Sequence, residues 1–480
     1  MELNEIIAQR RAKLDALKAK GILVYPKALA GRKDIGPALK DFREGERFVF
    51  AGRIMARRMH GKVVFMDLRD ATGKVQLYIK EDIVGKDYFS LMDSLDIADI
   101  ITAEGELFKT HTGEPSVKVE KITLLSKALR PLPEKWHGLK DVELRYRQRY
   151  LDLLANEEVR QVFLARSRVI RAIRSFLEER GFQEVETPMM HDIAGGASGR
   201  PFCTHHNEYD MGLYLRIAPE LYLKRLLVGG MDKVYEINRS FRNEGVSTRH
   251  NPEFTMLEVY SAYADFKDMM ELCQDLIISV SRVVKGGMNF SYQGKEINLK
   301  APWQVSSFSG MVKEKFGIEP QDEVETMLKK LQHKGYALDK KRLSRSQVNK
   351  IIEDVLEQGM QMDPVFVADY FTSLCPLAKT SPDNPLISER FELYVAGLEV
   401  GNAYSELNDP AEQRQRFQEE IKELDADEKK AVDEDYVQAL EHGMPPAGGL
   451  GIGIDRLVML LTDQPSIRDV ILFPLLRPQK

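Results

Sequence analysis

The sequence predicts an α+β protein of two domains: a five-stranded β-barrel, then a larger domain built on an antiparallel sheet flanked by helices. Three observations predict this fold class. The 480 residues are more than one ordinary domain needs. Five short runs with strand character follow one another between residues 47 and 125. Beyond residue 150 helical and strand patterns intermix, and some of these strands carry charged side chains on one face.

A basic amphipathic helix is predicted over residues 3–18, where apolar side chains recur at helical spacing among arginines and lysines. This helix either packs on its neighbour or also touches phosphates. The five strand-like runs that follow are RFVFAGRIMA, KVVFMDLRD, KVQLYIK, DIITAEGELF and SVKVEKITLL, separated by turn signals such as ATG and HTGEP. Five short strands fit a small closed sheet, and an OB-type barrel is the economical choice.

Barrels of this type often bind single-stranded nucleic acid through side chains on one face. The candidates here are Phe65, Gln76 and the loop residue Glu114. A plain structural barrel fits the same pattern equally well. The proline-containing stretch LRPLPEKWHGLKD, residues 129–141, is predicted to be a linker. We therefore expect domains at residues 1–145 and 146–480, with a polar helical insertion at about 311–365 in the second.

The formal charge of −5 is unevenly distributed. Residues 1–62 hold 15 Lys and Arg against 7 Asp and Glu, whereas residues 389–441 hold 16 acids against 6 bases. This distribution suggests one surface for a polyanion, although solvated faces would explain it as well. We find no apolar run long enough to span a membrane and no signal peptide, and the three cysteines are scattered. We expect a cytoplasmic protein without a membrane partner.

Two strands around residue 248 are predicted to form the floor of a site. KVYEINRSFRNE and EFTMLEVYSAY read as antiparallel strands joined by a polar loop. Because successive side chains alternate faces, one face carries Arg242 and Glu258 together with Phe254 and Tyr260. A solvated face would not hold these aromatic side chains, and a packed face would not hold the charged ones.

A second hairpin repeats the mixture. In SERFELYVAGLEVGNAYSELND, Glu392 and Glu399 flank an Ala-Gly turn, and Asn402, Tyr404 and Glu406 then share one face. The two acids could hold Mg²⁺, which usually takes one or two carboxylates together with substrate phosphates.

The stretch PPAGGLGIGIDRLVMLL is predicted to be a strand whose missing side chains let a ligand lie against its backbone. Too little chain follows it for a Rossmann unit, and it lacks the Gly-Lys-Ser/Thr of a P-loop. The helix that starts near Asp455 would point Arg456 at the sheet.

Together these segments place two arginines, a histidine and a metal pair near an excess of carboxylates. Arg242, Arg456, His250 and Mg²⁺ suit a triphosphate, at which charge develops in phosphoryl or nucleotidyl transfer. The surplus carboxylates need a cation, so the other substrate should be positively charged.

The segments resemble the signature motifs of class II aminoacyl-tRNA synthetases. GFQEVETPMM resembles motif 1, FRNE…RHNPEFTMLE resembles motif 2 and GGLGIGIDRLVML resembles motif 3. The resemblance is closest to the class II lysyl-tRNA synthetases and covers essentially the whole chain, including KTHTGEPSV, APELYLKRL, GNAYSELNDP and IRDVILFPLLRP. It implies an OB-fold anticodon-binding domain and a class II catalytic domain. It also implies ATP-dependent ligation of lysine to tRNA(Lys) through a lysyl-adenylate, by a homodimer formed largely through motif 1.

The resemblance also implies a role for each matched residue. Arg242 and Arg456 would be catalytic. The ATP-binding residues would be Arg242, Glu244, His250, Asn251, Phe254, Glu392 and Arg456. Lysine would be bound by Glu220, Glu258, Tyr260, Asn402, Tyr404 and Glu406. Glu392 and Glu399 would hold Mg²⁺, and Phe65, Gln76 and Glu114 would read the anticodon.

Three alternatives remain at this point. An aspartyl or asparaginyl enzyme shares the motifs, but its substrate side chain would not suit Glu406. A synthetase-like enzyme that modifies a protein would lack the front domain, which is present here. An OB-fold RNA-binding protein with a decayed catalytic domain would not keep Arg242, Glu399 and Arg456.

Overall fold

The protein is described by a computed structural model that covers residues 2–27, 31–133, 139–196, 199–336, 343–423 and 431–479. The chain divides into two compact units, residues 1–140 and 141–480, each of which is described by itself. Residues 134–138 of the predicted linker and 337–342 of the predicted insertion lie outside the described residues.

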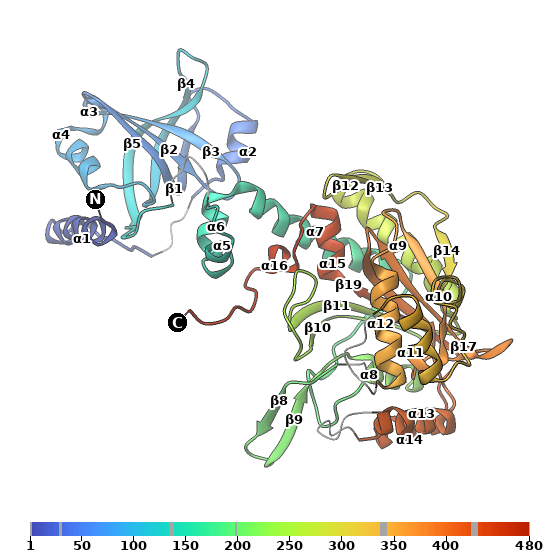
Figure 1. Ribbon diagram of the computed structural model, residues 1–480. Coiled ribbons are helices and arrows are strands. Elements are labelled where there is room, and N and C mark those ends of the chain that lie inside the picture. Colours follow the sequence, from blue (N-terminus) through green and yellow to red (C-terminus); the bar gives the residue numbers. More distant parts are fainter. Residues whose placement is uncertain are drawn as a thin grey trace. The chain divides into compact units, whose positions relative to one another are not determined.

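The first unit is a closed five-stranded barrel, as the sequence predicts, with one helix of 17 residues and several short ones (Figure 1). Its strands are β1 (Arg47–His60), β2 (Val63–Arg69), β3 (Lys74–Lys80), β4 (Ile100–Lys109) and β5 (Pro115–Ser126), in the order β1-β2-β3-β5-β4. Its helices are α1 (Leu3–Ala19), α2 (Ile35–Lys40), α3 (Glu81–Val84), α4 (Lys86–Phe89) and η1 (Ser90–Ser94). In β2 Val64, Met66 and Leu68 are fully buried and alternate with partly exposed neighbours, which is the period of a strand with one face on a core.

The N-terminal helix α1 is tied to this barrel. Leu14 and Leu17 are buried in the barrel core, and Arg10 donates hydrogen bonds to the carbonyls of Ala128 and Arg130. Packing on a neighbour, the first of the two roles expected for this helix, is therefore observed.

The second unit holds the larger sheet. Its strands are β6 (Gln183–Glu184), β7 (Met190–His191), β8 (Cys203–His206), β9 (Met211–Leu215), β10 (Lys233–Phe241), β11 (Glu253–Ala262), β12 (Asn289–Tyr292), β13 (Lys295–Asn298), β14 (Gln304–Ser307), β15 (Val365–Phe371), β16 (Thr380–Ser381), β17 (Asn384–Val395), β18 (Leu398–Ser405) and β19 (Ala447–Gly453). Its helices are α5 (Val142–Arg147), α6 (Arg149–Ala155), α7 (Glu157–Glu178), α8 (Glu220–Val228), α9 (Phe266–Lys285), α10 (Phe308–Phe316), α11 (Val324–His333), α12 (Arg345–Glu357), η2 (Thr372–Leu374), α13 (Pro410–Glu423), α14 (Glu434–Glu441), α15 (Ile454–Thr462) and α16 (Ile467–Val470).

The strand order is β14-β15-β17-β18-β19-β11-β10-β6, with β16 beside β17. The expected antiparallel sheet is confirmed from β15 to β10, but the sheet as a whole is mixed. The outer pairs β14–β15 and β10–β6 are parallel. Parallel strands need a long connection, and here β14 reaches β15 through α10–α12, and β6 reaches β10 through β7–β9 and α8. The antiparallel pair β17–β18 is instead joined by a tight turn.

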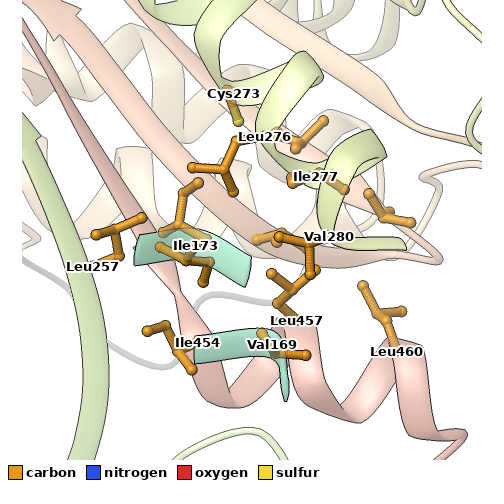
Figure 2. Packing of buried hydrophobic residues seen from close by; sticks show 14 of the residues in the cluster. Val169, Ile173, Leu257, Cys273, Leu276, Ile277, Val280, Ile454, Leu457 and Leu460 are labelled. Carbon is orange, nitrogen blue, oxygen red and sulfur yellow. The ribbon is translucent and has the colours of Figure 1, made fainter. Parts of the chain in front are cut away.

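Helices α7, α9 and α15 cover one face of the sheet. Figure 2 shows Ile173 of α7, Leu276 of α9 and Leu457 of α15 in one apolar cluster, with Leu257 of β11 at its edge beside Ile173. Helix α9 begins with a capping box between Asp265 and Asp268 and ends at Gly286 in the left-handed conformation, so its sequence specifies both ends. A Leu→Ala change in such a core typically costs about 2 to 5 kcal/mol. This packed layer fixes the sheet and leaves its opposite face for α8 and the site.

The region expected to be an insertion is helical. Helices α10, α11 and α12 bury a small core of their own that includes Phe308, Val312, Leu331 and Ile352 and lies against β15. Among the described residues, no helix is both long and apolar enough to cross a lipid bilayer.

Candidate active site

Strand β19 lies between β18 and β11 at the centre of the site, and its glycines line up with side chains of both neighbours. The register aligns Tyr404 of β18 with Gly449 and then with Tyr260 of β11. Two residues further on, Asn402, Gly451 and Glu258 form the next row. The predicted pairing of the two charged strands is also confirmed, because Glu236 lies opposite Glu258 and Ser240 opposite Phe254.

Gly449 has a specific steric reason to be glycine. A Cβ atom at this position would overlap Oε1 of Glu406 and lie 2.6 Å from the ring of Tyr260. The space left by the missing side chain is therefore filled by the Glu406 carboxylate and this ring. At Gly451 and Gly453 a Cβ would lie 3.4 Å and 3.7 Å from its nearest neighbours, so the floor is more open there.

At the Gly449 end the structure gathers three buried carboxylates. Glu258 lies on β11, Glu220 opens helix α8, and Glu406 follows the end of β18. Burial, with the charge of Glu220, raises the pKa of Glu258 to about 8. Burial also raises the pKa of Glu406 well above its usual value. Tyr404 donates to Glu220 over 2.5 Å, and Tyr260 donates to Glu258 over 3.3 Å. Five of the six residues predicted to bind lysine thus meet in this buried cluster.

Sequence reasoning missed a cation in the same pocket. Lys224 of α8 is 0% exposed, and its Nζ donates to Glu220 over 2.6 Å and forms an ion pair with Glu406. Burial alone would lower the pKa of Lys224, but the two carboxylates raise it, so the ammonium stays charged. In the sequence ELYLKRLLV this lysine reads as the solvated face of a helix, and only its spacing of four from Glu220 gives a signal.

Toward the Gly453 end the site is cationic. The guanidinium of Arg242, just beyond β10, lies 5.3 Å from the centre of the Phe254 ring. Its Nε atom is buried and has no hydrogen-bond partner among the described residues. Burial lowers the pKa of Arg242, with the Glu244 carboxylate acting in the opposite direction. A buried guanidinium with an unpaired donor gains strongly from an anion.

Arg456, in the first turn of α15, lies beside the turn of the β17–β18 hairpin. It donates to the Glu399 carboxylate over 3.0 Å and to the Glu399 carbonyl over 2.7 Å. Burial acts to raise the pKa of Glu399, but the charge and hydrogen bond of Arg456 prevail and lower it. The Nε2 atom of His250 lies 3.4 Å from the Arg456 guanidinium. Partial burial and the charge of Arg456 lower the pKa of His250 below its usual value.

Glu392, the other predicted metal ligand, is already well supplied with donors. Tyr370 and Tyr394 donate to it over 2.7 Å and 2.6 Å, and Arg390 forms an ion pair with it. Arg390 also donates to Asn402 over 3.0 Å. Asn402 lies opposite Glu392 in the sheet, and Arg390 therefore contacts both side chains. Arg390 is a further site residue that the sequence did not single out.

Asn251 lies in the polar loop before β11. Its side-chain amide donates to the carbonyl of Glu253 over 2.6 Å. Its Oδ1 atom is buried and has no hydrogen-bond partner in the described part of the chain. Glu244 is exposed but close to Arg242, because a Cβ at Gly199 would touch both side chains at 3.2–3.3 Å.

A buried ion pair holds α15 in place. Arg166 of α7 donates to Asp455 over 2.5 Å and to the hydroxyl of Thr255 over 2.9 Å. Asp455 in turn accepts from the backbone N–H of Thr255 over 2.7 Å. The residue next to Arg456 is thus fixed to both a helix and the sheet.

In the separate barrel unit, the three predicted residues share the outer face. Gln76 donates to Glu114 over 3.3 Å and accepts from Ser116 over 3.1 Å. Phe65 lies opposite Tyr78, with ring centres 5.5 Å apart, and Phe108 extends this aromatic row. Tyr78 and Phe108 were not predicted, although their strand parity gives the signal.

The two ends of the site differ in charge, which suits a molecule with a cationic end and an anionic end. Gly449 and Gly453 are four residues apart, about 13 Å along an extended strand. An anionic ligand part would meet Arg242, His250 and Arg456, and an ammonium would meet the carboxylates near Gly449. A substrate carboxylate in between would already be ionised at neutral pH and would need no general base.

Comparisons with known proteins agree with this geometry. Residues 141–477 match the family model of class II tRNA synthetases (D, K and N), and residues 48–125 match the OB-fold nucleic acid binding domain. The chain is 51% identical to a lysine–tRNA ligase of Carboxydothermus hydrogenoformans, over 100% of this chain and 99% of that protein. It is 52% identical to the lysine–tRNA ligase of Pelotomaculum thermopropionicum and 50% identical to that of Roseiflexus castenholzii, which cover 100% of this chain and 96% and 100% of their own lengths.

Proposed function

Because the chain belongs to the class II lysine–tRNA ligase family, we propose that it ligates lysine to tRNA(Lys) in an ATP-dependent reaction. The reaction passes through a lysyl-adenylate and releases AMP and pyrophosphate. The observation that carries this proposal is the group of three buried carboxylates, Glu220, Glu258 and Glu406, near the Gly449 end of β19. The cationic side chains Arg242 and Arg456 lie toward the Gly453 end of the same strand.

The cationic end of the site binds the nucleotide, and the acidic end binds the ammonium groups of lysine. Arg242 binds the lysine carboxylate and the α-phosphate, and so brings the nucleophile and the electrophile together. Its unpaired Nε and its place beside Phe254 support this role. Phe254 stacks on the adenine, with Glu244 and Asn251 near the nucleotide. Arg456 and His250 bind the outer phosphates, and phosphate binding would raise the lowered pKa of His250.

At the acidic end, Glu406 and Tyr260 receive the ε-ammonium of lysine. Glu220 and Glu258 line the same pocket, with the α-ammonium as their partner. Tyr404, which donates to Glu220, completes the wall. Asn402 closes the pocket on the side of the metal pair, where Arg390 holds it.

Mg²⁺ fits the oxygen ligands of Glu392 and Glu399, since its shell commonly combines one or two carboxylates with substrate phosphates. When bound, it would neutralise phosphate charge. Glu392 is oriented by two tyrosines and Arg390, and Glu399 by Arg456. These contacts orient the carboxylates of Glu392 and Glu399 before the nucleotide binds.

The barrel reads the anticodon. Residues 1–145 form this anticodon-binding domain and residues 146–480 the catalytic domain with its insertion at 311–365. The aromatic row that begins with Phe65 offers stacking surfaces for unpaired bases, and Gln76 and Glu114 offer hydrogen bonds to base edges.

A homodimer forms through the segment that resembles motif 1, where Met189 and Met190 are 43% and 54% exposed. Exposed apolar side chains of this kind are typical of a protein interface. Family membership, which links the enzyme to translation, supports a cytoplasmic location.

Amino-acid-dependent exchange of pyrophosphate into ATP, without tRNA, tests the proposal. We expect exchange with lysine and none above background with aspartate or asparagine. A Glu406→Gln variant should lose lysine-dependent exchange by about 100-fold or more, because it removes the carboxylate charge that receives the ε-ammonium in a buried site. Exchange with aspartate or asparagine would keep the reaction but refute the assignment of Glu406. No exchange with any of the three amino acids would refute the proposed synthetase activity.

A further inference from the structure

The amino-acid pocket contains more acid than a neutral interior tolerates. Glu220, Glu258 and Glu406 are all buried, and Glu406 is 0% exposed. A further carboxylate nearby, Glu236, is already neutralised by Arg216, which donates to it over 2.7 Å. Uncompensated carboxylates in such a place either find a cation or bind a proton.

Lys224 compensates one of the three. Its ammonium lies between Glu220 and Glu406, on the side of the pocket formed by α8, with the Tyr404 ring centre 5.4 Å away. Two carboxylates therefore remain in surplus. Lysine brings two ammonium groups, and its carboxylate has a separate partner in Arg242. Two uncompensated carboxylates match the two ammonium groups of lysine, and this match depends on Lys224, which compensates the third carboxylate.

The carboxylate of Glu406 is also incompletely satisfied. Apart from the ion pair with Lys224, its two oxygens accept no well-directed hydrogen bond from the described residues. Oε1 occupies the space that Gly449 leaves, whereas Lys224 approaches Oε2. A buried oxygen in this state is ready to accept from a second ammonium.

We propose that Lys224 is a specificity-determining residue of this pocket. Its permanently charged ammonium positions Glu406 and compensates one of the three carboxylates. The other two carboxylates then bind the ammonium groups of lysine and release protons as they do so. This inference rests on the proposed function. Lys224 acts through Glu406 and Glu220 and is a positioning residue in that sense.

The titratable groups around the pocket support the exchange. Glu258 is surrounded by Glu220, Tyr260, Arg242 and Glu236, and burial and Glu220 raise its pKa to about 8. Thus Glu258 holds a proton at pH 7 while the pocket is empty.

Glu406 meets Lys224 and Glu220 of α8, Glu258 and Tyr260 of β11, Tyr404 of β18 and Tyr436 of α14. Its pKa is raised by burial even though Lys224 acts to lower it. A second ammonium beside Glu406 would lower this raised pKa.

The sign of the pH dependence follows from this state. A carboxyl that is protonated in the empty pocket and ionised in the complex weakens lysine binding at low pH. The affinity for lysine should then rise about tenfold per pH unit for each proton released, and level off above the pKa of the empty pocket. ATP binding, at the other end of the strand, should not follow this dependence.

Calorimetric titration of the full-length wild-type protein with lysine, in buffers of different ionisation enthalpy, counts the protons directly. Between about pH 6 and pH 7 both substrate ammonium groups are mainly protonated. We expect between one and two protons released per lysine bound, and none on titration with AMP. Lysine binding without proton release would refute the exchange and leave the proposed function standing. No lysine binding would refute the proposed function itself.

Two substitutions at one position test Lys224. Lys224→Gln keeps a hydrogen-bond donor but removes the charge, so the pKa of Glu406 rises further. We expect the acid limb of kcat/KM for lysine to move up by at least about one pH unit, with KM for ATP changed less than about threefold. Lys224→Arg keeps the charge and should keep the acid limb near its wild-type position, even if a poorer fit raises KM.

The matched control is Lys295→Gln on the exposed hairpin strand β13. This change should move neither the acid limb of kcat/KM for lysine nor the KM for ATP. An unshifted acid limb in Lys224→Gln, or equal shifts in the Gln and Arg variants, would show that Lys224 acts only through packing. If Lys224→Gln does not fold, Lys224→Arg still decides, because an acid limb displaced by a unit despite the retained charge would refute the role.

Discussion

Single side chains near Gly449 determine what the amino-acid pocket can bind. The glycine leaves space for the Glu406 carboxylate, Lys224 holds that carboxylate from the other side, and Tyr260 closes the wall. None of these three contacts involves the cationic end of the site. Residue-scale changes here should therefore separate lysine binding from ATP binding.

Gly449→Ala is expected to impair lysine use selectively. The added methyl group would overlap Glu406 and lie 2.6 Å from Tyr260, and overpacking of this kind typically costs about 1 to 3 kcal/mol. The KM for lysine in pyrophosphate exchange should rise about tenfold or more, with little change in the KM for ATP. Gly212→Ala is the control, since nothing lies within 4 Å of its new Cβ. Equal rises in both KM values would contradict the assignment of Gly449 to the lysine pocket.

At the scale of elements, the start of α15 is positioned by contacts to α7 and β11. The side chains of Arg166 and Asp455 are 13% and 3% exposed, so their ion pair is largely removed from water. Asp455 also satisfies a backbone N–H of β11. These contacts of Asp455 therefore also position the neighbouring Arg456 in the site.

Asp455→Ala should lower the free energy of unfolding by about 3 to 5 kcal/mol, because it leaves the Arg166 guanidinium without its buried partner. Urea denaturation measures this loss, and the KM for ATP should rise in the variant that remains folded. Arg174→Ala, which removes the more exposed ion pair with Glu184, should cost less than about 1 kcal/mol. Similar losses for the two variants would show that the Arg166 pair does not fix α15.

At the scale of the whole molecule, the two compact units are expected to perform separable steps. The anticodon contacts that we propose all lie in residues 1–140, and every residue proposed for adenylate formation lies in residues 141–480. Helix α6 belongs to the second unit, since Arg149 donates to the carbonyls of Leu472, Arg468 and Ile471 near the C-terminus.

A chain lacking residues 1–140 should therefore keep most of its lysine-dependent pyrophosphate exchange. Its aminoacylation of tRNA(Lys) should fall by at least about 100-fold, because the stacking contacts to the anticodon are lost and each is worth about 1 to 3 kcal/mol. The purified first unit should bind the anticodon stem-loop, which serves as the control for folding. Undiminished tRNA charging would place the anticodon contacts outside the barrel.

The sequence by itself determined the five barrel strands, the antiparallel pair β10–β11, the glycine strand β19 and the two ends of the site. These features follow from local alternation, turn residues and side-chain chemistry, which short stretches of chain carry within themselves. Arg242, Glu258 and Glu399 could be selected because charged residues on strands that also carry aromatic side chains are unusual.

Only the tertiary structure decided which side chains meet. It paired Lys224 with Glu406, which is 182 residues away, and Arg390 with Asn402, and it made the outer strand pairs of the sheet parallel. A lysine in an amphipathic helix normally faces water, and nothing in its neighbours along the chain shows that a distant strand end will cover it. Such contacts depend on how helices and strands pack over long separations, because the energy that buries an ion pair comes from the surrounding fold.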